Sequence, residues 1–341
     1  MNNVIREDIT EFIKRFTFKR DLLNSTFLIT GATGLIGTAL IRCLSALSPT
    51  ISIVAPVRNI EKARQLFSTF HNVTLVEGNL ETFDYSLFSH IDYIVHGAAP
   101  TSSKYFVDKP VETINSIIKI TNHLFKYLST HPVKSVVFLS SLEIYGTILD
   151  NITITEEKQG IININDVRSS YPVAKQLAEN LCCAYVKEYG VPIKIARLTQ
   201  TTGAGISKED NRVIAQFVRC AADNKNIILH TKGLSARPYC YITDAVEAIL
   251  YILLRGTNGV SYNIANPSTY ISAQELASSV RRLLNPKIEI QYEFSNSMGY
   301  APTTYLNLSI ERLMGLGWKP RYDLEAILSK LYTYLKEEKN G

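Results

Sequence analysis

The sequence predicts an α/β protein built on a doubly wound parallel sheet, with a smaller, discontinuous C-terminal lobe. Short β-branched runs alternate with helical patterns, the first run ends in a glycine-rich turn, and the alternation stops near residue 200. Such alternation is typical of parallel sheets, because each crossover between parallel strands needs a helix-length connection. The expected strands are Phe27–Thr30, Ile51–Val57, Val73–Val76, Tyr93–Val95, Val136–Ser140, Ile193–Leu198 and Ser261–Ile264.

Residues 1–24 precede the first strand and predict a helical extension. Apolar residues recur at helical spacing from Ile5 to Phe16, which gives the helix one apolar face. Asn3 is the candidate N-cap, because its side chain can accept a hydrogen bond from the first turn. We expect this helix to pack on the body of the protein, or to contact a second subunit.

Composition excludes several classes of function. The formal charge of +5 is spread along the chain without a Lys/Arg block, so no nucleic-acid partner is expected. No apolar run approaches the roughly 20 residues of a membrane span, and the first residues lack the apolar core of a secretory signal. We therefore expect no membrane partner and a cytoplasmic location. The five cysteines form no CxxC pair, so neither a disulfide framework nor a metal site is expected.

The turn after the first strand has the pattern of a phosphate-binding loop. Its sequence, GATGLIG, has three glycines spaced GxxGxxG between a strand and a helix. Glycine permits positive φ, lets the backbone approach a pyrophosphate, and lets the helix pack closely on the strand. The start of the helix then presents N–H groups to the phosphates. We predict a Rossmann-like dinucleotide site, with a plain structural turn as the alternative. The expected contacts come from Gly31, Thr33, Gly34, Leu35, Ile36 and Gly37.

The end of the second expected strand bears on which dinucleotide binds. An acidic residue there usually bonds the ribose 2′-hydroxyl of NAD, whereas an arginine can accommodate the 2′-phosphate of NADP. This chain has Val57 and Arg58. Arg58 favours NADP, but the same side chain could stack on adenine or face solvent. The expected cofactor is therefore NAD or NADP.

A tyrosine and a lysine in SSYPVAKQLAENL form a candidate acid–base pair. Tyr171 and Lys175 are four residues apart on an expected helix, so they share one face and the ammonium can favour the phenolate. Without such help a tyrosine is a poor base at neutral pH. The alternative is an ordinary exposed pair on a helix surface.

Five motifs together resemble the extended short-chain dehydrogenase/reductase family, in particular its nucleotide-sugar epimerases, dehydratases and decarboxylases. The motifs are GATGLIG, HGAAP (96–100), SSLEIYG (140–146), YPVAK (171–175) and RPYCYITDA (237–245), in the family's order over about residues 25–320. The resemblance implies an NAD(P)-dependent enzyme, a nucleotide-sugar substrate and a homodimer. It also implies two parts: a dinucleotide-binding domain of residues 25–198 plus about 238–265, and a substrate-binding lobe of residues 199–237 plus 266–341.

The resemblance assigns roles to particular residues. Tyr171 and Lys175 match the family's base and its activator, Ser141 matches the residue that orients the substrate hydroxyl, and Asn115 matches a structural asparagine. His96 is not assigned to chemistry. The implied cofactor contacts beyond the glycine-rich turn are Arg58, Asn79, Leu80, Ala98, Ala99, Tyr171 and Lys175.

The implied reaction begins with transient oxidation at sugar C4. Tyr171 takes the proton of the 4-hydroxyl while C4 loses hydride to the nicotinamide, and Ser141 holds the oxygen in place. The resulting 4-ketone acidifies C5–H and activates a C6 carboxylate for loss. Epimerisation, dehydration and decarboxylation then compete.

Glu143 bears on the choice among these outcomes. Family dehydratases carry an Asp–Glu pair directly after the orienting residue, with the glutamate as the C5 base and the aspartate as the acid. This chain has Leu142 and Glu143, so the base is present and the acid is not. Decarboxylases keep the glutamate after a non-acidic residue, and 4-epimerases need no acid here. The alternative is that Glu143 faces solvent at the end of the strand.

Four residues are candidates for contact with the substrate. Ser141 and Glu143 are the first two. Gln200 is the third, because Gln200 and Thr202 stand where the family often has asparagine and tyrosine. Arg237 matches an arginine that binds the nucleotide phosphates or lies near the sugar carboxylate; a surface salt bridge is its alternative.

The leading expectation is a nucleotide-sugar epimerase/dehydratase-type enzyme that returns the hydride. The alternatives are a UDP-glucuronate-like decarboxylase, a net NADPH-dependent reductase of a keto-sugar, and a cofactor-sensing or scaffold protein on the same fold, because fold alone does not establish activity.

Overall fold

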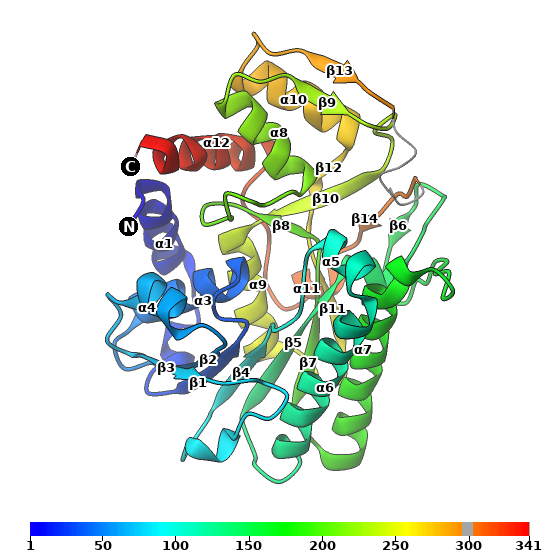
Figure 1. Ribbon diagram of the computed structural model, residues 1–341. Helices are drawn as coiled ribbons and strands as arrows, with labels where there is room; N and C mark the ends of the chain where they lie inside the picture. Colours follow the sequence, from blue (N-terminus) through cyan, green and yellow to red (C-terminus); the bar gives the residue numbers. More distant parts are fainter. Residues whose placement is uncertain (295–302, 341) are drawn as a thin grey trace.

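The centre of the computed structural model, which describes residues 1–294 and 303–340, is a seven-stranded sheet (Figure 1). Its order is β11-β7-β5-β4-β1-β2-β3, and every pairing is parallel. All seven predicted strands are present, with ends within one residue of those expected, so the predicted fold class is confirmed. The strands are β1 (Thr26–Thr30), β2 (Ser52–Val57), β3 (Val73–Glu77), β4 (Tyr93–His96), β5 (Ser135–Ser141), β7 (Ile193–Leu198) and β11 (Ser261–Ile264).

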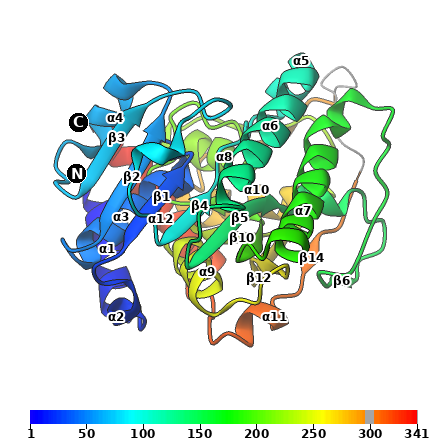
Figure 2. The ribbon, with the colours of Figure 1, turned by 90° about the horizontal axis from the view of Figure 1, so that it is seen from below.

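Helices cover both faces of the sheet, because its central strands are buried on both sides. One apolar core joins the sheet to α1, α3 and α9, and another joins it to α6 and α7. Figures 1 and 2 both show α6 and α7 side by side. The helices of these layers are α1 (Asn3–Arg15), α3 (Leu35–Leu47), α4 (Ile60–Phe67), α6 (Pro110–Leu128), α7 (Ser170–Tyr189) and α9 (Ile242–Arg255).

A second part of the chain has its own apolar core beyond the carboxyl ends of the strands. β10 lies between β8 and β12 in a three-stranded sheet, and β9 pairs with β13. The boundary expected near residue 238 falls within β10. The elements are β8 (Gln200–Thr202), β9 (Ile227–Leu229), β10 (Ala236–Tyr241), β12 (Asn266–Ser272), β13 (Ile290–Tyr292), α8 (Val213–Ala222), α10 (Ala273–Leu284) and α12 (Leu324–Asn340).

Short elements complete the architecture. They are α2 (Lys19–Leu22), η1 (Tyr85–Leu87), α5 (Ser103–Asp108), η2 (Leu142–Tyr145), η3 (Val167–Ser169), α11 (Glu311–Met314) and the paired strands β6 (Thr153–Ile154) and β14 (Asn307–Leu308). Within residues 1–294 and 303–340, every helix is too short or too polar to cross a bilayer.

The predicted N-terminal helix is α1, and it packs on the body of the protein against α3, α9 and α12. Its N-cap is Asn2, whose side chain accepts a hydrogen bond from the Val4 N–H at 3.0 Å. The cap predicted at Asn3 is therefore wrong by one residue. Asn3 is instead the first helical residue, and its backbone N–H donates to Glu337 of α12 at 3.1 Å.

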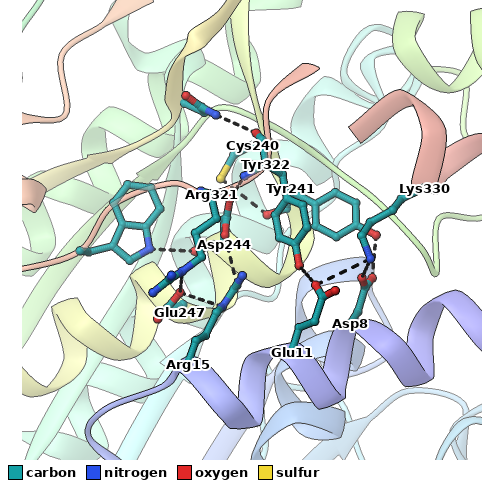
Figure 3. Close-up of polar contacts among 12 residues, drawn as sticks. Asp8, Glu11, Arg15, Cys240, Tyr241, Asp244, Glu247, Arg321, Tyr322 and Lys330 are labelled. Atoms are coloured by element: carbon teal, nitrogen blue, oxygen red, sulfur yellow. Dashed lines mark hydrogen bonds and ion pairs between the residues drawn. The ribbon is translucent and has the colours of Figure 1, made fainter. Parts of the chain in front are cut away.

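Buried charges fasten α1 to the elements beneath it (Figure 3). The Asp8 carboxylate accepts a hydrogen bond from the Tyr241 hydroxyl at 2.6 Å and pairs with Lys330 at 3.0 Å. The Arg15 guanidinium lies 3.1 Å from both Asp244 and Glu247. α1 is therefore joined to β10 by a buried hydrogen bond, to α9 by nearly buried ion pairs, and to α12 by an ion pair whose lysine is partly exposed.

Asp244 is the most connected of these charges. Its Oδ2 accepts hydrogen bonds from the backbone N–H groups of Arg321 and Tyr322, at 2.8 and 3.2 Å. Trp318 is buried, and its indole N–H donates to the Asp244 carbonyl oxygen. Burial raises the pKa of Asp244 and of Glu247, whereas the nearby Arg15 lowers each pKa. Arg15 thus offsets part of the unfavourable effect of burial on the two carboxylates.

Replacing Arg15 by methionine tests this arrangement. Arg15→Met removes the nearest cation from two buried carboxyls and leaves Glu247 with Arg321 at 3.7 Å. Breaking a buried pair of this kind costs about 3–5 kcal/mol. We expect the free energy of unfolding in urea to fall by that amount. Arg64→Met is the matched control, because the Arg64–Glu61 pair is exposed and exposed pairs contribute about 0–1 kcal/mol. Equal losses in the two variants would contradict a special role for Arg15.

Candidate active site

The glycine-rich turn between β1 and α3 is a cradle of bare backbone. Gly31 has φ +74°, and a Cβ there would lie 2.7 Å from the Gly97 carbonyl oxygen. A Cβ on Gly37 would overlap the Gly31 carbonyl oxygen. Gly34 is the exposed N-cap of α3, so the first N–H groups of a 13-residue helix are open to a ligand. A dinucleotide pyrophosphate fits such a cradle.

The other predicted cofactor residues follow the carboxyl ends of neighbouring strands. Arg58 is exposed after β2, and its side chain makes no hydrogen bond or ion pair with any residue of the described ranges. Asn79 is exposed after β3, where its side chain accepts from the Glu81 N–H at 3.1 Å. The structure brings the whole set to one edge of the sheet: Thr33, Leu35 and Ile36 after β1, Leu80 after β3, and Ala98 and Ala99 after β4.

His96 has a structural place at the end of β4. The Thr30 hydroxyl oxygen accepts from the N–H groups of Gly97 and Ala98, each at 3.2 Å. Its own hydrogen is therefore directed to His96 Nδ1 at 2.7 Å, and Nε2–H donates to Thr121 at 3.1 Å. Burial lowers the pKa of His96 to about 3. A neutral imidazole here positions the turn beside the cradle, in agreement with its exclusion from chemistry.

Tyr171 lies in the first turn of α7 and is buried. Its ring stacks on Phe106 of α5, with ring centroids 4.2 Å apart and planes 8° apart. Burial raises its pKa, and the Glu143 carboxylate raises it further. Hydrogen bonding with Ser141 and the charge of Arg168 lower the pKa. The net effect favours the neutral phenol, which α7 holds next to Ser141 at the end of β5.

Lys175 lies one turn further along α7, on the same face. Its Nζ donates to the Leu139 carbonyl oxygen of β5 at 2.7 Å and lies 5.9 Å from the centroid of the Tyr171 ring. Burial lowers its pKa to about 8. The predicted proximity of ammonium and phenol is present, without a direct hydrogen bond. Within the described residues, the Asn115 side chain makes no hydrogen bond to either residue.

Ser141 and Glu143 lie directly after β5, as predicted. The Ser141 hydroxyl accepts from the Glu143 N–H at 3.2 Å, which caps η2. The Glu143 carboxylate forms an ion pair with Arg168 at 2.9 Å, and both side chains are about one-quarter exposed, at 25% and 26%. Glu143 therefore neither faces solvent freely nor stands ready as an unpaired base.

Sequence reasoning did not identify Arg168 as a site residue. Its only signal was its position three residues before Tyr171, at the entrance to α7. Its partner is 25 residues away in sequence, so spacing alone could not reveal the pair.

Gln200 and Arg237 come from adjacent strands of the second sheet. β8 pairs with β10, and Gln200 follows Leu198, which lies opposite Ser141 in the main sheet. Arg237 is half-buried, and its side chain makes no hydrogen bond or ion pair to any residue that the structure describes. The predicted alternative, a surface salt bridge, is not seen there. Thr202 is fully buried, and its hydroxyl lacks a described partner.

Comparison with known proteins identifies relatives of the chain. Residues 27–265 match the model of the NAD dependent epimerase/dehydratase family. UDP-glucuronic acid decarboxylase 6 of Arabidopsis thaliana is 30% identical over 238 residues, 70% of this chain and 68% of that protein. The dTDP-D-glucose 4,6-dehydratase of Homo sapiens is 26% identical over 327 residues, 91% and 89% of the two chains.

Solved structures share the fold. An epimerase of Methanothermobacter thermautotrophicus superposes with a TM-score of 0.82 at 21% identity, over 96% of this chain and 97% of that one. The UDP-glucose 4-epimerase of Thermotoga maritima gives 0.78 at 21% identity, over 92% and 99%.

Gly37→Ala tests the cradle. Its Cβ must displace the Gly31 carbonyl, and overpacking of this kind costs about 1–3 kcal/mol. We expect NADH binding, followed by fluorescence, to weaken by about tenfold or more. Gly315→Ala is the control, because Gly315 lies at the end of α11 with φ −60° and an ordinary helical backbone. A folded Gly37→Ala protein that binds NADH as tightly as the parent would show that the turn is only structural.

The structural role of His96 predicts that its ring stays neutral at physiological pH. Its pKa is lowered to about 3, so no proton is taken up until far below neutrality. The ¹⁵N chemical shifts of the His96 ring should report the Nε2–H tautomer and remain constant from about pH 5 to pH 8. A titration of these shifts within that range would contradict the assignment.

Proposed function

The chain belongs to the NAD-dependent epimerase/dehydratase family, and we propose that it is a nucleotide-sugar decarboxylase that oxidises a nucleotide-linked hexuronate transiently at C4. The observation that carries the proposal is the Glu143–Arg168 ion pair beside Tyr171. A 4,6-dehydratase needs a free glutamate and an adjacent acid. Here Glu143 is paired and Leu142 cannot donate a proton.

Loss of carbon dioxide makes smaller demands on these side chains than dehydration does. Once C4 is a ketone, the C6 carboxylate is β to the carbonyl, so the C5–C6 bond can break without a protein base. Arg237, on β10 beside β8, is a cation without a hydrogen bond or ion pair to any described residue, and it suits a substrate that carries a diphosphate and a carboxylate. Relatives named UDP-glucuronic acid decarboxylases are consistent with this choice.

The residues of the chain divide the work of the first step. When bound at the cradle, the dinucleotide supplies an acceptor for hydride and later its donor. Tyr171 takes the proton of the sugar 4-hydroxyl, and Ser141 orients that oxygen. Lys175 places positive charge near the phenol and thereby favours its ionisation. Gln200 and Arg237 bind the nucleotide sugar from the second sheet.

We further propose NAD as the cofactor and a homodimer as the assembly. The family is described as NAD dependent, and Arg58 then stacks on adenine or faces solvent. Exposed apolar side chains on α6 and α7, Val111, Ile114 and Leu177, supply a surface for a second copy of the chain.

A 4-epimerase is the second candidate. It needs no acid at position 142, so Leu142 suits it equally well. The mass of the product separates the two activities, because epimerisation leaves the mass unchanged.

Incubation with UDP-glucuronate and NAD tests the proposal. We expect a product lighter by carbon dioxide in mass spectrometry, without net NADH accumulation. Tyr171→Phe should lower kcat by about 10²–10⁴-fold, because it removes the proton acceptor. An isomer of the substrate would indicate an epimerase, loss of water a dehydratase, and steady consumption of NADPH a reductase. Each of these results would contradict decarboxylation. An undiminished rate for Tyr171→Phe would overturn the assignment of the base.

A further inference from the structure

The ion pair between Glu143 and Arg168 is fixed by the local backbone at both residues. Glu143 is placed by η2, which follows β5 directly, and Arg168 is placed by η3, which precedes α7 directly. Asp166 caps η3 by accepting a hydrogen bond from the Arg168 N–H at 2.9 Å. Both ends of the ion pair are therefore fixed by the same elements that fix Ser141 and Tyr171.

An aromatic stack fixes the guanidinium as well. The Arg168 guanidinium carbon lies 5.1 Å from the centroid of the Phe106 ring, whose other partner is Tyr171 at 4.2 Å. The Ser170 hydroxyl donates to the Phe106 carbonyl oxygen at 3.2 Å, which joins α5 to α7. A guanidinium over an aromatic face gains a cation–π contact, so Arg168 is held by the Phe106 ring as well as by Glu143.

The charges of Glu143 and Arg168 change the pKa of the Tyr171 phenol. Glu143 raises the pKa of the phenol and Arg168 lowers it, so both charges are close enough to influence the reacting oxygen. Within the described residues, Arg168 is the one cation in ion-pair contact with Glu143.

We propose that Arg168 is a positioning residue that withholds Glu143 from the sugar C5–H bond and so confines the reaction to loss of the carboxylate. The inference rests on the proposed function, because it concerns the fate of the 4-ketone formed there.

The chemistry of the two routes differs at C5. In decarboxylation the C5–C6 bond breaks, its electron pair becomes the enolate of the 4-ketone, carbon dioxide leaves, and C5 then takes a proton from solvent. With a free Glu143, the carboxylate removes the C5 proton, and the C–H electron pair forms the same kind of enolate with C6 still attached. Return of a solvent proton to C5 gives the 4-keto hexuronate, labelled or inverted at C5, and return of the hydride to C4 would then give labelled or inverted uronate. Hydrogen bonding to Arg168 makes the carboxylate a weaker base, so the second route is suppressed.

Deuterium exchange at C5 measures the suppressed route. The enzyme is incubated in D₂O with NAD and UDP-glucuronate, and the recovered substrate is analysed by mass spectrometry. The parent should return unlabelled uronate, whereas Arg168→Met should raise C5 labelling by about tenfold or more, on the scale of general-base effects. Arg168→Lys keeps the charge without the planar fork and should lie between them.

Two variants connect the exchange to the pair. Arg168→Met combined with Glu143→Gln should show no gain in labelling, because the freed base is absent. Arg312→Met is the matched control, because it removes an arginine of α11 from an ion pair with Glu157, away from Glu143. Exchange that stays low in Arg168→Met, or that persists in the double variant, overturns the inference.

Failure of the proposed function gives a different pattern. If the enzyme forms a 4-ketone from UDP-glucuronate without losing carbon dioxide, decarboxylation is refuted. Increased C5 exchange in Arg168→Met would then still support the part of the inference that Arg168 withholds Glu143 from the C5–H bond.

A second measurement does not depend on turnover. A water-soluble carbodiimide should label Glu143 several-fold faster in Arg168→Met than in the parent, with about tenfold as the upper end expected for loss of one charged partner. The modified peptide is identified by mass spectrometry. Equal labelling in the two proteins contradicts the pairing and with it the inference.

Discussion

Desolvation at the carboxyl end of β5 is the constraint on which the site depends. Tyr171 and Lys175 are both buried, and burial acts on each against its charged form: the phenol pKa rises and the ammonium pKa falls to about 8. Buried polar groups of this kind need partners. Lys175 finds the Leu139 carbonyl and the Phe138 ring face, and Tyr171 finds Phe106 and Ser141. The site therefore depends on α7 keeping one fixed position along β5.

The same physics explains why α1 carries charges on a buried face. Asp244 begins α9 directly after β10, the strand that bears Arg237. Asp8 reaches Tyr241 at the end of that strand, and Arg15 reaches Asp244. Because a buried charge is stable only when paired, Asp8 and Arg15 of α1 help to hold β10 and the start of α9 in place. The strand that carries Arg237 is therefore fastened in part by a helix far away in sequence.

Local patterns in the sequence were sufficient for the main sheet and the cradle. Runs of apolar β-branched residues identify strands buried on both faces. The GxxGxxG spacing identifies the turn, and the structure leaves no space for a Cβ at Gly31 or Gly37. Contacts between distant segments were not accessible in this way. The Arg168–Glu143 pair spans 25 residues and the Tyr241–Asp8 hydrogen bond spans 233, and no periodicity encodes either. The N-cap at Asn2 was missed for a related reason, because Asn3 is drawn into the helix by its bond to Glu337 of α12.

Leu142 and Arg168 both limit what Glu143 can do in the proposed reaction. A glutamate next to a 4-ketone is productive for dehydration only if a neighbouring acid protonates the departing hydroxyl. With Leu142 in that place, a free Glu143 could remove a C5 proton but could not complete the elimination, and the proton would return without net reaction. In the proposed reaction, an arginine that pairs with the glutamate suppresses this unproductive route. Its charge also offsets the negative charge of Glu143 near Tyr171. The acidic residue at the end of β5 is therefore best understood through its partner at the start of α7.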